Sequence, residues 1–210
     1  MQLIFLVILI GALAAGVIVL ALLGWAQRRR RLKLTRVAHA MGLKFSADDP
    51  FDLTNRYRGF VLPSAGHSPR ADNVIYGRHR GWSVRAFDYY FEAGHGPHRL
   101  GRRYGVIVAD TDVDLRRALM WHGADPGPVP IAAAMPGGEA GPWHVVHGGA
   151  SAAALAEAFG GFADEPVNVQ TDRRSVMLCA AGRWKPDDLS RRIDAAVGAL
   201  ENLKARWGGA

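Results

Sequence analysis

The sequence has almost no cysteine and, at its N-terminal end, no acidic residue. Cys179 is the single cysteine, so an intramolecular disulfide and a zinc site built from several thiolates are both excluded. The first 36 positions contain six basic residues and no acid: Arg28, Arg29, Arg30, Arg31, Lys33 and Arg36. Subtracting these six charges from the formal net charge of +7 leaves +1 for residues 37–210. The basic character is thus one short cluster, whereas a nucleic-acid-binding domain would carry its charge on a folded face.

Recognisable catalytic and cofactor motifs are also missing. Gly94-His95-Gly96 begins like a dinucleotide-binding loop, but Arg99 stands where the third glycine is required and a strand is expected to follow. The serines are not surrounded by a nucleophile-elbow motif, and no catalytic triad can be assigned. We therefore predict no cofactor, and the catalytic residues, if there are any, stay unknown.

What the sequence does have is a long apolar run at its start. Leu3 to Ala26 is a stretch of 24 residues without a charge, and a helix needs roughly 20 to cross the hydrocarbon core of a bilayer. Trp25 would then lie at the interface, where its amphipathic ring is favoured. A cleaved signal peptide would have positive charge before its apolar stretch, whereas here the charge follows it. We therefore predict a transmembrane anchor over residues 1–27.

The basic flank predicts both a helix and an orientation. Leu34, Val37, Ala38 and Met41 fall at helical spacing before Gly42, so residues 28–42 are expected to continue the anchor as a juxtamembrane helix. Basic residues stay on the cytoplasmic side, which predicts a single-pass inner (plasma) membrane protein with its N-terminus outside and its domain in the cytoplasm. The residues expected to set this topology and to contact anionic lipid are Trp25, Arg28, Arg29, Arg30, Arg31 and Lys33.

Residues 43–210 are expected to form one soluble α+β domain of antiparallel strands with helices packed on one face. The clearest signal is a hairpin of residues 73–76 and 82–91 joined by residues 77–81. Further strands are predicted over residues 43–45, 104–109, 129–133 and 143–146, and a second hairpin over residues 167–171 and 175–180.

Two helices complete the predicted domain. Ser151 is expected to cap a short helix that ends at Phe159. Pro186 suits the first position of a last helix, and Asp187 and Asp188 suit its positive end. Its apolar stripe consists of Leu189, Ile193, Ala196, Val197, Leu200 and Leu203.

Five side chains are weak candidates for a metal site. They are Asp110, Asp112 and Asp114, which alternate along the chain, and His95 and His98 in a loop rich in glycine and proline. An EF-hand loop would need glycine in place of Leu115 and glutamate in place of Trp121, so an EF-hand is excluded. Zinc needs three or four ligands on a defined frame, and the histidine pair lacks a third. We therefore predict no metal.

Residues 56–104 carry nine arginines and three acidic residues, a local charge of +6, with aromatic residues interleaved. Such a surface could bind single-stranded RNA or rest on anionic lipid headgroups. Solvation of loop tips is the simpler explanation, because runs of charge are weak signals, and nucleic acid is not an expected partner.

Several segments together resemble a group of uncharacterised bacterial membrane-anchored proteins. The similar features are the N-terminal helix with its basic flank, Gly77 and Gly81 around the hairpin turn, Phe87-Asp88-Tyr89 at a strand end, and Pro186–Leu189 at the start of a helix. The resemblance implies the same architecture over nearly the whole chain and no particular activity.

The leading hypothesis is a non-enzymatic binding module at the cytoplasmic membrane face, with the membrane and an unidentified protein as partners. One alternative is a membrane-tethered enzyme or metal-binding domain that uses the aspartates or histidines named above. The other is an RNA-binding domain that uses residues 56–104.

Overall fold

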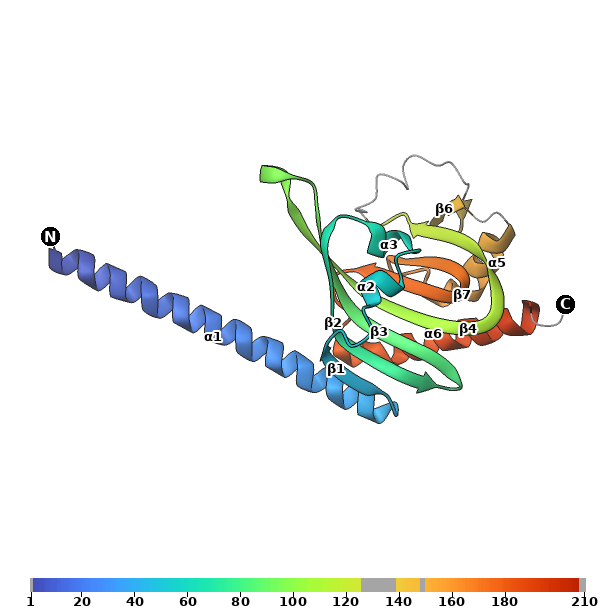
Figure 1. Cartoon of the computed structure of the whole chain (residues 1–210), viewed down its shortest axis with the longest axis horizontal. Helices are drawn as coiled ribbons and strands as arrows, with labels where there is room; N and C mark the ends of the chain where they lie inside the picture. The colour runs from blue at the N-terminus through green and yellow to red at the C-terminus, as the bar shows by residue number, and fades with distance from the viewer. Residues whose placement is uncertain (1, 126–138, 148–149, 208–210) are drawn as a thin grey trace.

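A computed structural model describes residues 2–125, 139–147 and 150–207. The chain begins with α1 (Gln2–Ala40), one uninterrupted helix whose N-terminal part projects away from the rest of the molecule (Figure 1). Its last turns pack on the domain, where Leu34 and Ala38 are buried. The helix ends where the Leu43 amide donates to the Ala38 carbonyl (2.8 Å) and Gly42 adopts a φ of 68°, which confirms the predicted glycine stop.

The described strands form a seven-stranded antiparallel sheet in the order β1-β2-β3-β4-β6-β5, with β7 also paired to β4. Their bounds are β1 Lys44–Asp48, β2 His67–His79, β3 Trp82–Ala93, β4 Leu100–His122, β5 Glu139–Ala140, β6 Trp143–His147 and β7 Val167–Ala181. The 23-residue β4 is the centre of the sheet, because β3, β6 and β7 all pair with it.

Hydrophobic cores lie on both faces of this sheet. On one face, α1, α5 (Ala150–Ala158) and α6 (Pro186–Trp207) cover residues such as Ile107 and Leu178. The other face is covered by the short α2 (Leu53–Arg56) and α3 (Val61–Ser64). Short 3-10 turns occupy Gly96–His98 and Gly160–Phe162. The predicted α+β class, with antiparallel strands and helices packed on the sheet, is confirmed, and the short α2 and α3 on the second face are additions to the prediction.

The predicted second hairpin is wrong. Residues 167–171 and 175–180 belong to the single strand β7, which pairs with β4 from one end to the other. The Asp172-Arg173 pair, expected to be a turn, is absorbed as an irregularity in the register, with Arg173 at a φ of 46°. A polar dipeptide between two apolar runs therefore lies within one continuous strand here and does not reverse the chain, while the extra residues of the irregular register belong to β4.

Other boundaries also differ from the predictions. The strand expected over residues 104–109 extends from Leu100 to His122 and contains the three alternating aspartates. The first hairpin turns at Arg80 and Gly81, both with positive φ (51° and 86°), so its loop is shorter than predicted. Ser151 lies inside α5 and does not precede it. The strand predicted over residues 129–133 lies outside the described residues.

Candidate functional site

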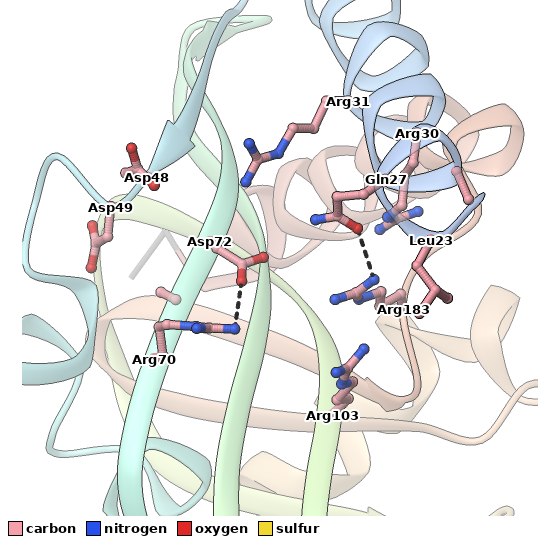
Figure 2. Close-up of a pocket in the computed structure, with 12 residues that line it drawn as sticks. Leu23, Gln27, Arg30, Arg31, Asp48, Asp49, Arg70, Asp72, Arg103 and Arg183 are labelled. Carbon is pink, nitrogen blue, oxygen red and sulfur yellow. Dashed lines mark hydrogen bonds and ion pairs between the residues drawn. The ribbon is translucent and has the colours of Figure 1, made fainter. Parts of the chain in front are cut away.

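A cleft of about 780 Å³ lies between α1 and the sheet, and we call it the α1–sheet cleft (Figure 2). Its α1 wall includes Leu23, Ala26 and Gln27. Eight charged residues line it: Arg30, Arg31, Arg70, Arg103, Arg183, Asp48, Asp49 and Asp72. The cleft thus joins the end of the apolar run to a charged surface.

Arg30, which lines the cleft, forms an ion pair with the buried Asp88 of β3. Arg30 Nη2 donates to both carboxylate oxygens of Asp88 (2.7 and 3.0 Å), and Nη1 donates to the Trp184 carbonyl (2.9 Å). The two side chains are only 16% and 8% exposed. This largely buried pair fixes the position of α1 on the sheet, because separating the two groups would leave a charge away from water.

The strand pattern explains why Asp88 faces the helix. Phe87 and Tyr89 point into the core under α2 and α3, so Asp88 between them points to the opposite face, like Val84 and Ala86. The Phe-Asp-Tyr segment therefore buries two aromatic rings on one side of the sheet and presents one carboxylate to α1 on the other.

Asn73 connects the strands of this site. Its Nδ2 donates to Asp88 Oδ2 (2.9 Å) and to Asp72 Oδ1 (2.7 Å), and its Oδ1 accepts from Arg31 Nε (3.2 Å). Asn73 has a φ of 53°, at a register shift between β2 and β3. Asparagine tolerates this left-handed conformation better than most residues, so the side chain is held between two carboxylates.

The pKa of Asp72 reflects its surroundings in this site. Burial raises the pKa of Asp72 above its ordinary value, and the negative charge of Asp88 raises it further. Arg70, Arg183 and Arg31 act in the opposite direction. Ionising Asp72 therefore costs free energy even in this arginine-rich surrounding.

Arg183 closes the cleft on the side of α1. Its Nε lies 3.6 Å from Asp88 Oδ2, and its Nη1 donates to Gln27 Oε1 (3.4 Å). In Figure 2, the Arg183 side chain extends beside Gln27, with Arg103 below it. The guanidinium groups of Arg30, Arg103 and Arg183 therefore all line this cleft.

The rest of the basic flank has different surroundings. Arg28 is exposed, and Arg29 lies over the Trp25 ring with its Cζ 3.6 Å from the ring centroid. Lys33 forms an exposed ion pair with Asp187 in the first turn of α6 (3.1 Å). Of the six residues predicted to contact lipid or set topology, the structure therefore directs Arg30 and Arg31 into the cleft and Lys33 to α6.

The candidate metal ligands do not converge. Asp110 pairs with Arg85 (2.5 Å), Asp112 pairs with Lys204 (2.7 Å), and Asp114 is exposed. His95 Nε2 lies 3.4 Å from His67 Nε2. Among the described residues, no group of three or more histidine, cysteine, aspartate or glutamate side chains could hold a metal ion.

The arginines of residues 56–104 are distributed over several unrelated contacts. Arg85 is largely buried against Asp110 and Tyr57, Arg80 pairs with Glu201 of α6, and Arg99 pairs with Glu92. The local charge of +6 is thus divided among opposite ends of the sheet.

Sequence reasoning missed Asp72, Asn73, Asp88, Arg103 and Arg183 as site residues. Two signals were available for the central pair. Arg30 lies four residues before Leu34 and eight before Ala38, and this spacing places it on the same buried face of α1. In β3, Asp88 shares its face with apolar neighbours, and a carboxylate on such a face needs a partner.

The fold and the cleft define a class of protein: an α+β domain built onto the end of a long apolar N-terminal helix. No protein-family model matches the sequence, and no curated protein matches it. The fold is similar to that of the mycobacterial trehalose monomycolate transport factor A, TtfA, known from a crystal structure. The TM-score is 0.57 at 17% sequence identity, over 84% of this chain and 93% of that chain. At this identity the similarity concerns the fold alone.

Proposed function

We propose that this chain is a single-pass inner-membrane protein whose α+β domain is a non-enzymatic binding module held against the cytoplasmic face. One observation carries the proposal: a single uninterrupted helix is exposed and apolar in its first part and is locked to the sheet by Arg30 in its last part. The anchor over residues 1–27, the juxtamembrane helix over 28–42 and the domain over 43–210 are parts of this proposal.

The surface of the apolar part supports a membrane setting. Within the described residues, one helix is long and apolar enough to cross a membrane, Ile4–Ala40. Its large side chains before Trp25 are between 47% (Leu9) and 70% (Leu20) exposed, so the domain does not cover them. At about 1.5 Å per residue the 24-residue charge-free stretch spans about 36 Å, enough for a core of about 30 Å.

The residues after the apolar part support the orientation. Arg28 and Arg36 remain exposed, and the Trp25–Arg29 contact places an aromatic ring and a cation together where the apolar stretch ends. Tryptophan at the interface and arginine on the cytoplasmic side are the usual arrangement. The domain would then lie inside the cell.

The unbroken connection between α1 and the domain supports a binding role. Because α1 continues from the apolar part into the domain without a break, the α1–sheet cleft would be held at the depth of the lipid headgroups. The β3–β4 hairpin projects toward the same side of the domain as the free part of α1 (Figure 1). Leu100, at its end, is 58% exposed.

The structural comparison points in the same direction. The protein with the similar fold is described as a transport factor. By analogy of fold, we propose that this chain is an accessory protein in a process at the membrane, and that a partner protein carries out any chemical step of that process.

Membrane flotation followed by alkaline carbonate extraction tests the proposal. The full chain should float with membranes and resist extraction, whereas a variant lacking Leu3–Ala26 should remain in the soluble fraction. Chemical crosslinking in intact membranes should then join the full chain to a membrane protein, and the deletion variant should lose that product. A full chain that carbonate releases, or that gives the same products without its apolar segment, would contradict the proposal.

A further inference from the structure

We infer that the α1–sheet cleft binds the phosphate of an anionic phospholipid, whose headgroup lies between α1 and β2 and whose acyl chains follow the apolar part of α1. This inference rests on the proposed function, because a bilayer lipid reaches the cleft only if α1 crosses the membrane.

The cleft holds cationic donors that the protein does not neutralise. In the described part of the chain, neither Arg31 nor Arg103 has a carboxylate within 4.0 Å. Among the described residues, the Arg31 side chain donates to the neutral amide of Asn73, and Arg103 is exposed beside the Tyr90 ring. A phosphate monoanion would supply the acceptor oxygens that these two guanidinium groups lack.

Arg183 adds a third cation, whose side chain lines the cleft and is 27% exposed. Its Nε is shielded from solvent and has no hydrogen-bond partner, since Asp88 lies too far away at 3.6 Å. The Arg183–Asp88 ion pair is long, so an anion seated in the cleft would give this guanidinium group a second partner of opposite charge. The side chain of Arg183 lies next to that of Leu23 in Figure 2, so the donor is adjacent to the apolar wall.

The apolar wall distinguishes a lipid from a free anion. Leu23 and Ala26 line the cleft and belong to the exposed apolar face of α1, which continues toward the N-terminus. A ligand with a phosphate next to the arginines can therefore extend its acyl chains along the helix. A free phosphate would leave this wall unused.

The opposite wall favours a headgroup that carries hydroxyls. Asp48 and Asp72 lie across from Arg103 and Arg183 in Figure 2. Carboxylates accept hydrogen bonds from hydroxyl groups and repel additional negative charge. We therefore expect phosphatidylglycerol, with one charge and two hydroxyls, to bind better than phosphatidic acid of the same chain length.

The test is native mass spectrometry of the full chain in detergent, titrated with phosphatidylglycerol, phosphatidic acid, phosphatidylcholine of matched chain length, or inorganic phosphate. The variants are Arg103→Gln and Arg31→Gln. The matched control is Arg78→Gln, which removes the same charge from the other end of β2. At about 1 kcal/mol for each basic residue near a lipid surface, each cleft variant should weaken phosphatidylglycerol binding about 5-fold, and Arg78→Gln should leave it unchanged.

Three results would overturn the inference. One is equal binding of phosphatidylglycerol and phosphatidylcholine, another is an equal effect of Arg78→Gln and Arg103→Gln, and the third is binding of inorganic phosphate as tight as that of the lipid. Flotation of the same variants separates the two proposals. If all variants float but lipid preference does not change, the cleft inference alone fails. If the unaltered chain does not float, the membrane role fails and the cleft inference falls with it.

Discussion

Breaking the buried Arg30–Asp88 pair should loosen α1 from the sheet and destabilise the domain. Removing one partner of a buried ion pair costs about 3–5 kcal/mol, because the other charge remains buried without its counter-ion. The two changes should differ in size. Arg30→Met leaves Asp88 with Asn73 and a distant Arg183, whereas Asp88→Leu leaves both Arg30 and Arg183 without a carboxylate.

We therefore expect Arg30→Met to lower the free energy of unfolding by about 2–3 kcal/mol and Asp88→Leu by about 3–5 kcal/mol. In a domain of this size, 1 kcal/mol shifts the melting temperature by about 2–4 °C, so Asp88→Leu should lower it by roughly 6–20 °C. The double variant should be more stable than the sum of the single losses predicts, by about 1–3 kcal/mol, because two apolar side chains replace the pair.

Thermal unfolding of the full chain in detergent, followed by tryptophan fluorescence, measures these shifts, since Trp143 and Trp184 are buried. Arg28→Met is the control, as it removes an exposed charge from the same helix and should shift the melting temperature by less than about 2 °C. Additive losses in the double variant, or a loss in Arg30→Met no larger than in the control, would refute the account of the pair.

Three further predictions follow from the core and the site. Asp72→Asn should raise the melting temperature at pH 7, because the raised pKa of Asp72 means that its ionised form destabilises the folded state. This destabilisation is lost once the pH falls below the pKa of the unfolded chain, near 3.8, where Asp72 is protonated in both states. A gain in melting temperature that persists at pH 3 would contradict this reasoning. Burial raises the pKa of Cys179 to about 12 from an ordinary 9.0, so its alkylation at pH 8 should be roughly 1000-fold slower in the folded than in the unfolded chain; comparable rates would show that the thiol is accessible. Gly105→Ala should destabilise the domain by about 1–3 kcal/mol in urea unfolding, because the added Cβ would lie 2.6 Å from the Trp184 ring. A neutral result would mean that the segment of Trp184, between β7 and α6, moves freely to accept the methyl group.

The elements that the sequence predicted are those with strong local signals. α1 follows from a charge-free run and a glycine stop, and α6 from an N-terminal proline and an apolar stripe, so both needed no information from distant residues. The first hairpin likewise depends on a short turn between two apolar strands.

The predictions failed where long-range pairing decides the structure. β7 is one strand because β4 accepts its irregular register, and nothing in the local composition of Asp172-Arg173 distinguishes a continuous strand from a turn. The cleft is harder still to predict, since it brings together residues from α1, β1, β2, β4 and the segment before α6. Asn73 contributes only because a left-handed backbone at a register shift turns its side chain toward Asp88.

The membrane topology of the chain is the most direct test of the central claim, that α1 crosses the membrane and holds the domain inside the cell. A reporter active only in the cytoplasm and, separately, one active only outside it would be fused after Ala210. The account predicts activity from the cytoplasmic reporter alone, because the basic residues that follow the apolar stretch should remain inside. Activity from the external reporter alone would contradict it and place the domain and its cleft on the outer side of the membrane.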